Sequence, residues 1–365
     1  MSERLLMKGN EAVGEAAIRA GCRLFFGYPI TPQNEIPEYM SRRLPEVGGV
    51  FLQAESEIAA INMVYGAAGA GARVMTSSSS PGISLKMEGI SYIAGAELPC
   101  VIVNMVRGGP GLGGIQPAQS DYFQATKGGG HGDYRMLVLA PASVQEMADC
   151  TADAFELADK YRNPVMVLGD GALGQMMEPV TFSKPPVSVS ELPPKPWATT
   201  GARGRAPNIV NSLHLENEEL EKLNLRLEAK YLRMKSEDVR AEVIDCDEAD
   251  VILVAYGTMS RVCRSAANLA RSAGLRVGIV RPITLFPFPS EILSELAKKG
   301  VPFLVVELSL GQMVEDVKLA VNGASPVQFY GRTGGFLPTP KEILARMESV
   351  LKDRSQAPCG AVPER

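Results

Sequence analysis

The sequence predicts an α/β fold in which a larger parallel-sheet domain is followed by a smaller α/β domain. In residues 1–180, short continuous apolar runs alternate with helical patterns, as is typical of parallel strands that helices cover on both faces. The same alternation returns in the last third of the chain, after a proline-rich stretch and a charged helical segment. The predicted division is therefore 1–180, a connecting segment at 181–247, and a second domain at 248–355.

The first domain is predicted to alternate helix and strand from its beginning. Asn10 has the residue type and the position of an N-cap for a helix over 11–20. A second helix should end near Arg43, and a third, rich in small residues, should cover 56–71. Further helices are expected at about 81–95 and 143–160, and strands at 23–27, 48–53, 73–77, 99–105, 136–140 and 164–168.

The rest of the chain is predicted to be a connection and a second sheet. Residues 179–207 hold seven prolines, which indicates a linker or an arm that wraps a neighbour. Residues 213–241 favour a packed amphipathic helix, because apolar residues recur there at helical spacing, at Leu213, Leu220, Leu223, Leu227 and Met234. Four parallel strands are expected after that, at 251–257, 276–282, 302–307 and 326–331.

Composition excludes several classes of function. The net charge is -4 and no basic patch is sustained, which argues against a nucleic-acid partner. The beginning of the chain lacks the apolar core of a signal peptide, and no apolar run approaches the roughly 18 residues of a membrane span. Six cysteines without a CxxC pair are typical of free thiols in a reducing compartment. The sequence therefore predicts a cytoplasmic protein without a membrane segment.

The segment AESEIAAINMVYGAAGA (54–70) places two glutamates where a predicted strand ends and a helix begins. Glu55 and Glu57 could there do no more than compensate the helix dipole. Glu57, however, opens an ExxAxxxxxGxA pattern (57–68) that is typical of the pyrimidine-binding domains of thiamine-diphosphate enzymes. In those domains the glutamate hydrogen-bonds N1′ of the aminopyrimidine, a task that suits a carboxyl group acting as an acid–base catalyst.

Three other motifs follow predicted strands. YPITP (28–32) holds two prolines that fix the backbone, and Thr31 is either part of a structural turn or a hydrogen-bond partner for a substrate. The serines of SSSSPG (77–82) either cap the next helix or approach the pyrimidine. RGGPGLGG (107–114) lacks the GK[ST] of a phosphate loop. Its Arg107 either pairs with a nearby carboxylate or presents its guanidinium to a substrate carboxylate or phosphate.

Taken together, these motifs resemble those of the 2-oxoacid:ferredoxin oxidoreductases. YPITP, QAESEIAA, TSSSSPG and VNMVRGGPG occur in that order, each at a predicted strand end. The resemblance covers nearly the whole chain. It is to the alpha-type subunit, also called the B subunit, in which a pyrimidine-binding domain precedes a transketolase-C-like domain. The branched-chain type, which acts on 3-methyl-2-oxobutanoate (2-ketoisovalerate), is the most similar, and the 2-oxoglutarate type is the runner-up.

The resemblance implies a role for each candidate residue. Glu57 would bind and activate thiamine diphosphate. Thr31 and Arg107 would bind the substrate carboxylate and take part in catalysis. Pro29 of YPITP and Ser79 of TSSSSPG are assigned to the cofactor. The implied reaction is oxidative decarboxylation of a 2-oxoacid to CO₂ and acyl-coenzyme A, with reduction of ferredoxin.

The resemblance also implies that part of the machinery lies on other chains. A GDG occurs at 169–171, but no asparagine follows between Ala172 and Pro207 to complete a Mg²⁺–pyrophosphate motif, so we interpret it as a turn. A beta-type partner would hold the pyrophosphate, Mg²⁺ and a [4Fe-4S] cluster, with no metal ligand on this chain. A gamma subunit and a ferredoxin-like delta subunit would complete a heterotetramer that uses coenzyme A.

Two other functions remain open at this point. The chain could be a non-catalytic scaffold that assembles its partners, or a self-sufficient thiamine transferase such as a transketolase. KGGGHGDY (127–134) is predicted to be a flexible loop. Its Lys127 and His131 could alternatively meet coenzyme A or another subunit.

Overall fold

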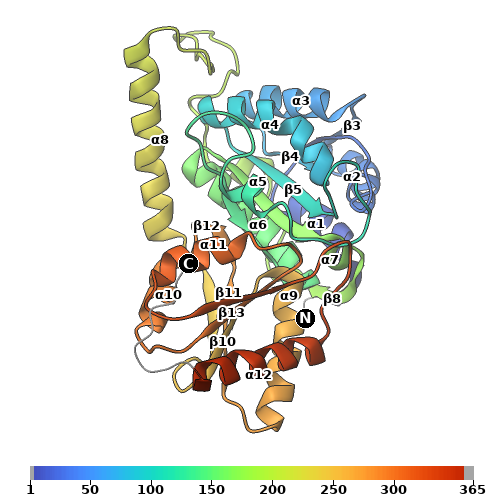
Figure 1. Ribbon diagram of the computed structural model, residues 1–365. Helices are drawn as coiled ribbons and strands as arrows, with labels where there is room; N and C mark the ends of the chain where they lie inside the picture. Colours follow the sequence, from blue (N-terminus) through green and yellow to red (C-terminus); the bar gives the residue numbers. More distant parts are fainter. Residues whose placement is uncertain (1–3, 357–365) are drawn as a thin grey trace.

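The computed structural model describes residues 4–356 and contains two helix-covered sheets (Figure 1). The larger sheet has seven strands in the order β12-β6-β7-β5-β4-β2-β3. All its strands run parallel except β12, which pairs antiparallel with β6. In that order, the strands are Thr284–Phe286, Leu137–Leu139, Pro164–Asp170, Cys100–Val106, Val74–Ser78, Leu24–Gly27 and Val50–Gln53.

Helices cover the larger sheet because each one buries an apolar face. Helices α3 and α4 pack against each other, α3 also packs onto β4 and α4 onto β5, whereas α1 packs against both α2 and α6. The longest central strands, β5 and β7, are buried along their whole length, as expected for strands covered on both faces. The helices of this domain are α1 Gly9–Arg19, α2 Glu35–Glu46, α3 Glu57–Gly69, α4 Ser80–Gly95, α5 Tyr122–Thr126, α6 Val144–Tyr161 and α7 Gly171–Gln175.

The smaller sheet has five strands in the order β14-β13-β10-β11-β9, one more than the four expected. The strands are Val327–Gly331, Phe303–Glu307, Val251–Val254, Val277–Pro282 and Ala241–Ile244. The additional strand, β9, is antiparallel to β11 and has no fully buried residue, so it lacks the continuous apolar run that marks the others. The helices of this part of the chain are α9 Gly257–Ser272, α10 Ser290–Ala297, α11 Met313–Val321 and α12 Pro340–Gln356.

One hydrophobic cluster joins the two sheets, and the other face of the smaller sheet has a separate cluster. Buried residues of both sheets, among them Val103 of β5 and Val305 of β13, belong to the same cluster. The short strand β12 lies between the strands of the smaller sheet in sequence, yet it extends the larger one. A separate two-stranded ribbon pairs β1 (Arg4–Lys8) with β8 (Met177–Thr181).

Asn10 is not the N-cap of the first helix, contrary to the prediction. The helix begins at Gly9, two residues earlier than predicted, and Lys8 occupies the cap position. Asn10 is buried inside α1, where its Nδ2 donates to Pro32 O at 2.9 Å and to Glu35 Oε2 at 2.7 Å. A residue type that suits a cap therefore serves instead to fasten α1 to the loop after β2.

The proline-rich arm packs on its own chain. Val187 N donates to Arg19 O at 2.7 Å, and Thr199 N donates to Gly69 O at 2.9 Å, near the C-terminal ends of α1 and α3. The Trp197 ring lies under the Arg162 guanidinium, 4.5 Å from its centroid. A one-turn helix, η1 (Val189–Glu191), is part of the arm. Of the two roles predicted for this stretch, the structure shows an arm, and the surface it covers belongs to the chain itself.

Helix α8 (Asn217–Glu237) follows the arm and stands along one side of the molecule (Figure 1). It is amphipathic, as expected, and it buries Leu223, Leu227, Tyr231 and Met234. Leu213 precedes the helix and is exposed, and Leu220 is also exposed. The buried stripe therefore starts later than predicted and includes a tyrosine.

Candidate active site

The candidate residues gather at the C-terminal edge of the larger sheet. Strands β5, β4, β2 and β3 are neighbours there, and a candidate motif follows each of them. Parallel strands place these ends on the same edge, which is the usual ligand-binding edge of such a sheet. YPITP follows β2, Glu57 follows β3, SSSSPG spans the end of β4, and Arg107 follows β5.

Glu57 is the first residue of α3, and it is only 6% exposed. Ser56 caps this helix, accepting a hydrogen bond from Ala59 N at 3.2 Å. Within the described part of the chain, no donor is hydrogen-bonded to the Glu57 carboxyl group, whereas Glu55 is exposed. Buried carboxyl groups are normally hydrogen-bonded, so a carboxyl group without a donor is available to a ligand that brings one.

Gly82 of α4 leaves the space in which the Glu57 carboxyl group lies. A Cβ atom on Gly82 would come within 2.6 Å of Glu57 Oε1 and 2.1 Å of Ser78 Oγ. The Ser78 hydroxyl is itself buried without a hydrogen-bond partner among the described residues. Two unpaired oxygens from α3 and β4 thus meet over a glycine of α4.

Arg107 is 7% exposed, and its guanidinium binds backbone carbonyls rather than a carboxylate. Nη1 donates to Thr31 O at 2.9 Å, and Nη2 donates to Leu112 O at 3.1 Å. Nε is buried without a partner. Among the described residues no carboxylate lies within 4.0 Å of it, so the ion-pair alternative does not apply here. A buried guanidinium without a counter-ion attracts an anion.

The YPITP loop brings Thr31 to Arg107 and leaves Pro29 and Thr31 exposed. The Thr31 hydroxyl accepts only a long hydrogen bond, 3.4 Å, from Asn34 Nδ2. Beneath the loop, buried Gln33 donates to Tyr28 O at 3.3 Å, and it accepts from the Ser77 hydroxyl. The loop tip is therefore accessible, while its base is fixed to β4.

The serines at the start of α4 connect it to β5. Ser79 is the N-cap residue, but its hydroxyl donates to Met105 O at 2.6 Å rather than accepting a cap hydrogen bond. The Ser80 hydroxyl accepts from Arg107 N at 3.0 Å and donates to Asp121 at 2.7 Å. Burial raises the pKa of the Asp121 carboxyl. The first turn of α4 thus contacts Arg107 through Ser80 and Glu57 through Gly82.

Lys86 is a buried residue of this region that no sequence motif singled out. Its side chain is completely buried, and Nζ donates to Thr76 Oγ1 at 3.0 Å and Ser77 O at 3.3 Å. Burial lowers the pKa of Lys86 to about 8, against the opposing effect of Glu57. The available signal was its position, because it lies one helical turn after Gly82 on the face that buries Ile83 and Ile90.

The GDG sequence at 169–171 forms a strand-to-helix junction. Gly169 and Asp170 end β7, and Gly171 begins α7. Asp170 caps this helix by accepting hydrogen bonds from Ala172 N at 2.9 Å and Leu173 N at 3.1 Å. Burial raises the pKa of this carboxyl. Across the described residues, no group of three His, Cys, Asp or Glu side chains is placed to hold a metal ion.

The KGGGHGDY loop is packed against the protein. Lys127 forms an ion pair with Asp316 of α11. The His131 ring lies edge-on to Tyr92 of α4 at 6.1 Å between centroids, and His131 O accepts from the Ser91 hydroxyl at 2.7 Å. The loop is thus held to both domains.

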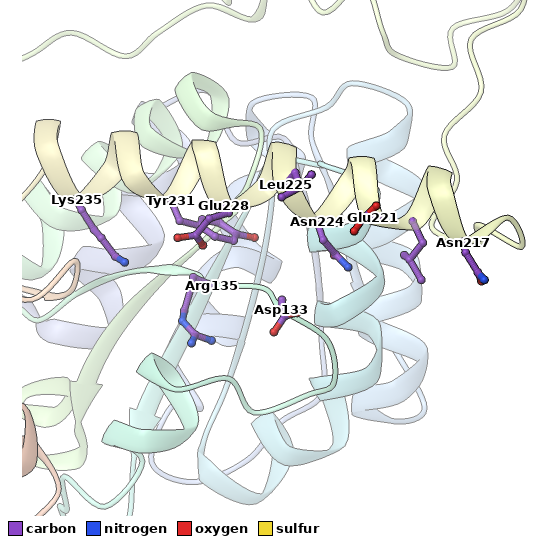
Figure 2. Close-up of a pocket in the computed structure, with 10 residues that line it drawn as sticks. Asp133, Arg135, Asn217, Glu221, Asn224, Leu225, Glu228, Tyr231 and Lys235 are labelled. Atoms are coloured by element: carbon purple, nitrogen blue, oxygen red, sulfur yellow. The ribbon is translucent and has the colours of Figure 1, made fainter.

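A groove of about 650 Å³ lies away from these residues, between α8 and the end of the KGGGHGDY loop (Figure 2). Arg135 and Asp133 face the helix across it. Neither Glu57 nor Arg107 lines it.

No helix in the part of the chain that the structure describes is long and apolar enough to cross a membrane.

Two family models match the chain over its two sheets. Residues 15–216 match the model described as "Pyruvate flavodoxin/ferredoxin oxidoreductase, thiamine diP-bdg". Residues 249–343 match "Pyruvate:ferredoxin oxidoreductase core domain II". The first match alone covers more than half of the chain, and it contains all the candidate site residues.

Known relatives are similar over nearly the whole chain. Ketoisovalerate oxidoreductase subunit VorB of Methanothermobacter thermautotrophicus is 55% identical, over 96% of this chain and 99% of that protein. The 2-oxoglutarate synthase subunit KorA of Methanothermobacter marburgensis is 39% identical, over 95% of this chain and 99% of that protein.

A solved structure has the same fold. The 2-oxoglutarate:ferredoxin oxidoreductase from Magnetococcus marinus, with 2-oxoglutarate, coenzyme A and succinyl-CoA bound, gives a TM-score of 0.86 at 28% identity. The match covers 96% of this chain but 66% of that one, so this chain spans just under two thirds of its length. These findings confirm the predicted fold class and the predicted resemblance. The chain belongs to the 2-oxoacid:ferredoxin oxidoreductases, as an oxidoreductase subunit with a thiamine-diphosphate-binding domain.

Proposed function

We propose that the chain is the alpha-type subunit of an enzyme that oxidatively decarboxylates 3-methyl-2-oxobutanoate to CO₂ and an acyl-coenzyme A, reducing ferredoxin. The main support is Glu57, which lies in a thiamine-diphosphate-binding domain and whose buried carboxyl group lacks a hydrogen-bond donor. The branched-chain substrate is favoured over 2-oxoglutarate because identity is 55% to the ketoisovalerate subunit and 39% to the 2-oxoglutarate subunit.

The residues around Glu57 fit the aminopyrimidine part of the cofactor. Unpaired oxygens of Glu57 and Ser78 suit the N–H groups of that ring, and Gly82 keeps the space beside them open. When bound, thiamine diphosphate supplies the carbon nucleophile and electron sink that decarboxylation of a 2-oxoacid requires. Glu57 would accept the hydrogen bond from N1′ and exchange a proton with it.

Arg107 and Thr31 are proposed to bind the carboxylate of the substrate. Support comes from the guanidinium, which has no counter-ion and retains a free Nε, and from its bond to the Thr31 carbonyl. The carboxylate leaves as CO₂, so this binding aids catalysis only if it persists toward the transition state. Exposed Pro29 would contact the cofactor, and Ser79 would fix the first turn of α4 beside it.

We propose that the site is closed by a beta-type partner that brings the pyrophosphate-binding residues, Mg²⁺ and a [4Fe-4S] cluster. Exposed apolar side chains support this: Ile58 on α3, Leu85 on α4, and Leu52 on β3, the strand that precedes α3. Gamma and ferredoxin-like delta subunits would complete a cytoplasmic complex that uses coenzyme A. Within the chain we propose the parts 1–180, 181–247 and 248–355.

Purification of the chain with its encoded partners tests this function. Viologen reduction should require coenzyme A and thiamine diphosphate, and kcat/KM should be highest for 3-methyl-2-oxobutanoate across a panel of 2-oxoacids. A higher value for 2-oxoglutarate would favour the alternative substrate. Turnover by the isolated chain would instead identify a self-sufficient transferase. A complex that assembles but binds no thiamine diphosphate would be a scaffold.

Substitution of Gly82 by alanine is expected to lower turnover of the complex about a hundredfold, since a displacement of about 1 Å in a catalytic group costs that much. The new methyl group would force Glu57 or Ser78 to move. Gly95→Ala on the same helix is the matched control, because its Cβ would meet only Ser212 Cβ at 3.5 Å. Steady-state viologen assays measure both variants. Equal activity of the two would show that Glu57 needs no space at Gly82.

A further inference from the structure

We infer that Lys86 is a positioning residue for Glu57. The buried ammonium group of Lys86 provides a fixed positive charge, which keeps the Glu57 carboxyl group ionised once cofactor and partner close the site. The inference rests on the proposed cofactor role of Glu57. It assigns a task to a charged side chain that no motif of the chain explains.

The first observation is that the Lys86 ammonium group is poorly compensated where it lies. It is completely buried, although lysines are almost never fully buried without a partner of opposite charge. Its three donors find one hydroxyl, Thr76 Oγ1, and one carbonyl, Ser77 O. No carboxylate of the described residues forms an ion pair with it. A buried charge with so few partners lowers the stability of the fold. If this position served packing alone, methionine would give the higher stability.

The second observation is the direction in which this charge acts. Lys86 lies one turn after Gly82 on the same face of α4, and side chains in a helix lean toward its N-terminus. That end of α4 is where Gly82 meets the Glu57 carboxyl group. Among the carboxylates of the described structure, Glu57 is the one whose charge opposes the lowering of the Lys86 pKa by burial. Lys86 and Glu57 are therefore close enough to interact electrostatically, although no ion pair joins them within the described residues.

Other ionisable groups around α4 are accounted for elsewhere. Strand β4 offers none, and β5 offers only the buried thiol of Cys100. Asp121 is hydrogen-bonded to Ser80 and Asn104, Asp170 caps α7, and Glu88 accepts from Tyr92. Arg107, whose backbone N–H donates to Ser80, is a second buried cation beside α4, and its guanidinium binds Thr31 O and Leu112 O. Other groups lie on the KGGGHGDY loop or nearer the surface, among them Lys127 (paired with Asp316), His131, Asp133, Glu55 and the partly buried Tyr65 of α3.

The charge matters most when the site is closed. Cofactor and partner would remove the remaining water from Glu57, and loss of water favours the neutral form of a carboxyl group. A cation held in the protein opposes this without occupying the carboxylate oxygen that must accept the hydrogen bond from N1′. A direct ion pair would occupy the carboxylate, whereas a charge that forms no ion pair with it leaves it free.

Two substitutions of Lys86 separate charge from packing. Lys86→Met removes the charge and keeps the length of the side chain, and Lys86→Arg keeps the charge. The assembled complex of each is compared with the wild type for the Kd of thiamine diphosphate by calorimetry and for kcat/KM against pH. Lys86→Gln serves as a second neutral variant if the methionine variant fails to fold.

The neutral variants are expected to bind thiamine diphosphate at least tenfold more weakly. The acid limb of their pH profile should move up by about one unit, the size of effect that one neighbouring opposite charge has on a carboxyl group. Because burial lowers the pKa of Lys86 to about 8, wild-type activity should fall as pH rises through that value. Lys86→Arg should retain affinity and extend the alkaline limb, since arginine stays charged.

Unchanged affinity and an unchanged acid limb in Lys86→Met would overturn the inference. Equal impairment of the methionine and arginine variants would overturn it as well, because that pattern indicates packing alone. Failure of the proposed function is recognised separately, since Glu57→Gln would then retain turnover. If the Glu57→Gln variant is inactive and the Lys86→Met variant behaves as wild type, only the role of Lys86 is ruled out.

Discussion

Replacement of Glu57 by glutamine is expected to lower turnover of the assembled complex by about a hundredfold to ten-thousandfold, the usual contribution of a general acid–base group. Glutamine has nearly the same size and still accepts a hydrogen bond, but it cannot exchange a proton. Ser56 caps α3 independently of the Glu57 side chain, so the helix and the fold should persist.

Glu55→Gln is the matched control for this prediction. Glu55 lies two residues earlier and is exposed, so its loss should leave turnover near the wild-type value. Steady-state viologen reduction and gel filtration of the complex measure activity and assembly together. Retention of more than about a tenth of the activity by Glu57→Gln would rule out its role as the acid–base group, since such groups contribute more than that.

The sequence was informative wherever a local pattern decides the structure. Continuous apolar runs located β5 and β7, because burial on both faces leaves no polar position in such a strand. The strands that escaped prediction lack this signal. Strands β1 and β8 each have one fully buried residue, β9 lies at a sheet edge and has none, and β12 is three residues long. Where one residue type has two uses, as at Asn10, only the tertiary contacts decide.

The candidate site divides in the same way. Glu57, Thr31 and Arg107 carry motif signals at strand ends, and the parallel sheet places those ends on one edge. Ser78, Gly82 and Lys86 stand in the same stretch of chain, but their importance depends on which atoms of other elements lie beside them. The distance from a Cβ atom added at Gly82 to Glu57 Oε1 depends on the tertiary structure and cannot be predicted from spacing within the sequence.

Replacement of Arg107 by alanine is expected to raise the KM for the 2-oxoacid by about tenfold to a hundredfold. Hydrogen bonds from a charged group contribute about 1.5–3 kcal/mol, and each 1.4 kcal/mol is about a factor of ten. The change should fall mainly on KM, because the guanidinium binds a group that is not itself protonated or deprotonated. The kinetic constants of the complex measure this split.

Arg107→Lys and Arg276→Ala make the assignment specific. Lysine keeps the charge but lacks the planar fork whose two nitrogens donate to Thr31 O and Leu112 O, so its KM should lie between those of the wild type and the alanine variant. Arg276 pairs with Asp250 on the exposed surface of the smaller domain, and its loss should leave KM unchanged.

If KM in Arg107→Ala equals that of the wild type, the guanidinium serves only to join the two loops through their carbonyls. The substrate carboxylate must then be bound by other groups. Because Arg107 holds both loops, a thermal melt of the alanine variant should accompany the kinetics. A lower melting temperature with unchanged KM would identify the structural role, whereas a raised KM at an unchanged melting temperature would identify the carboxylate site.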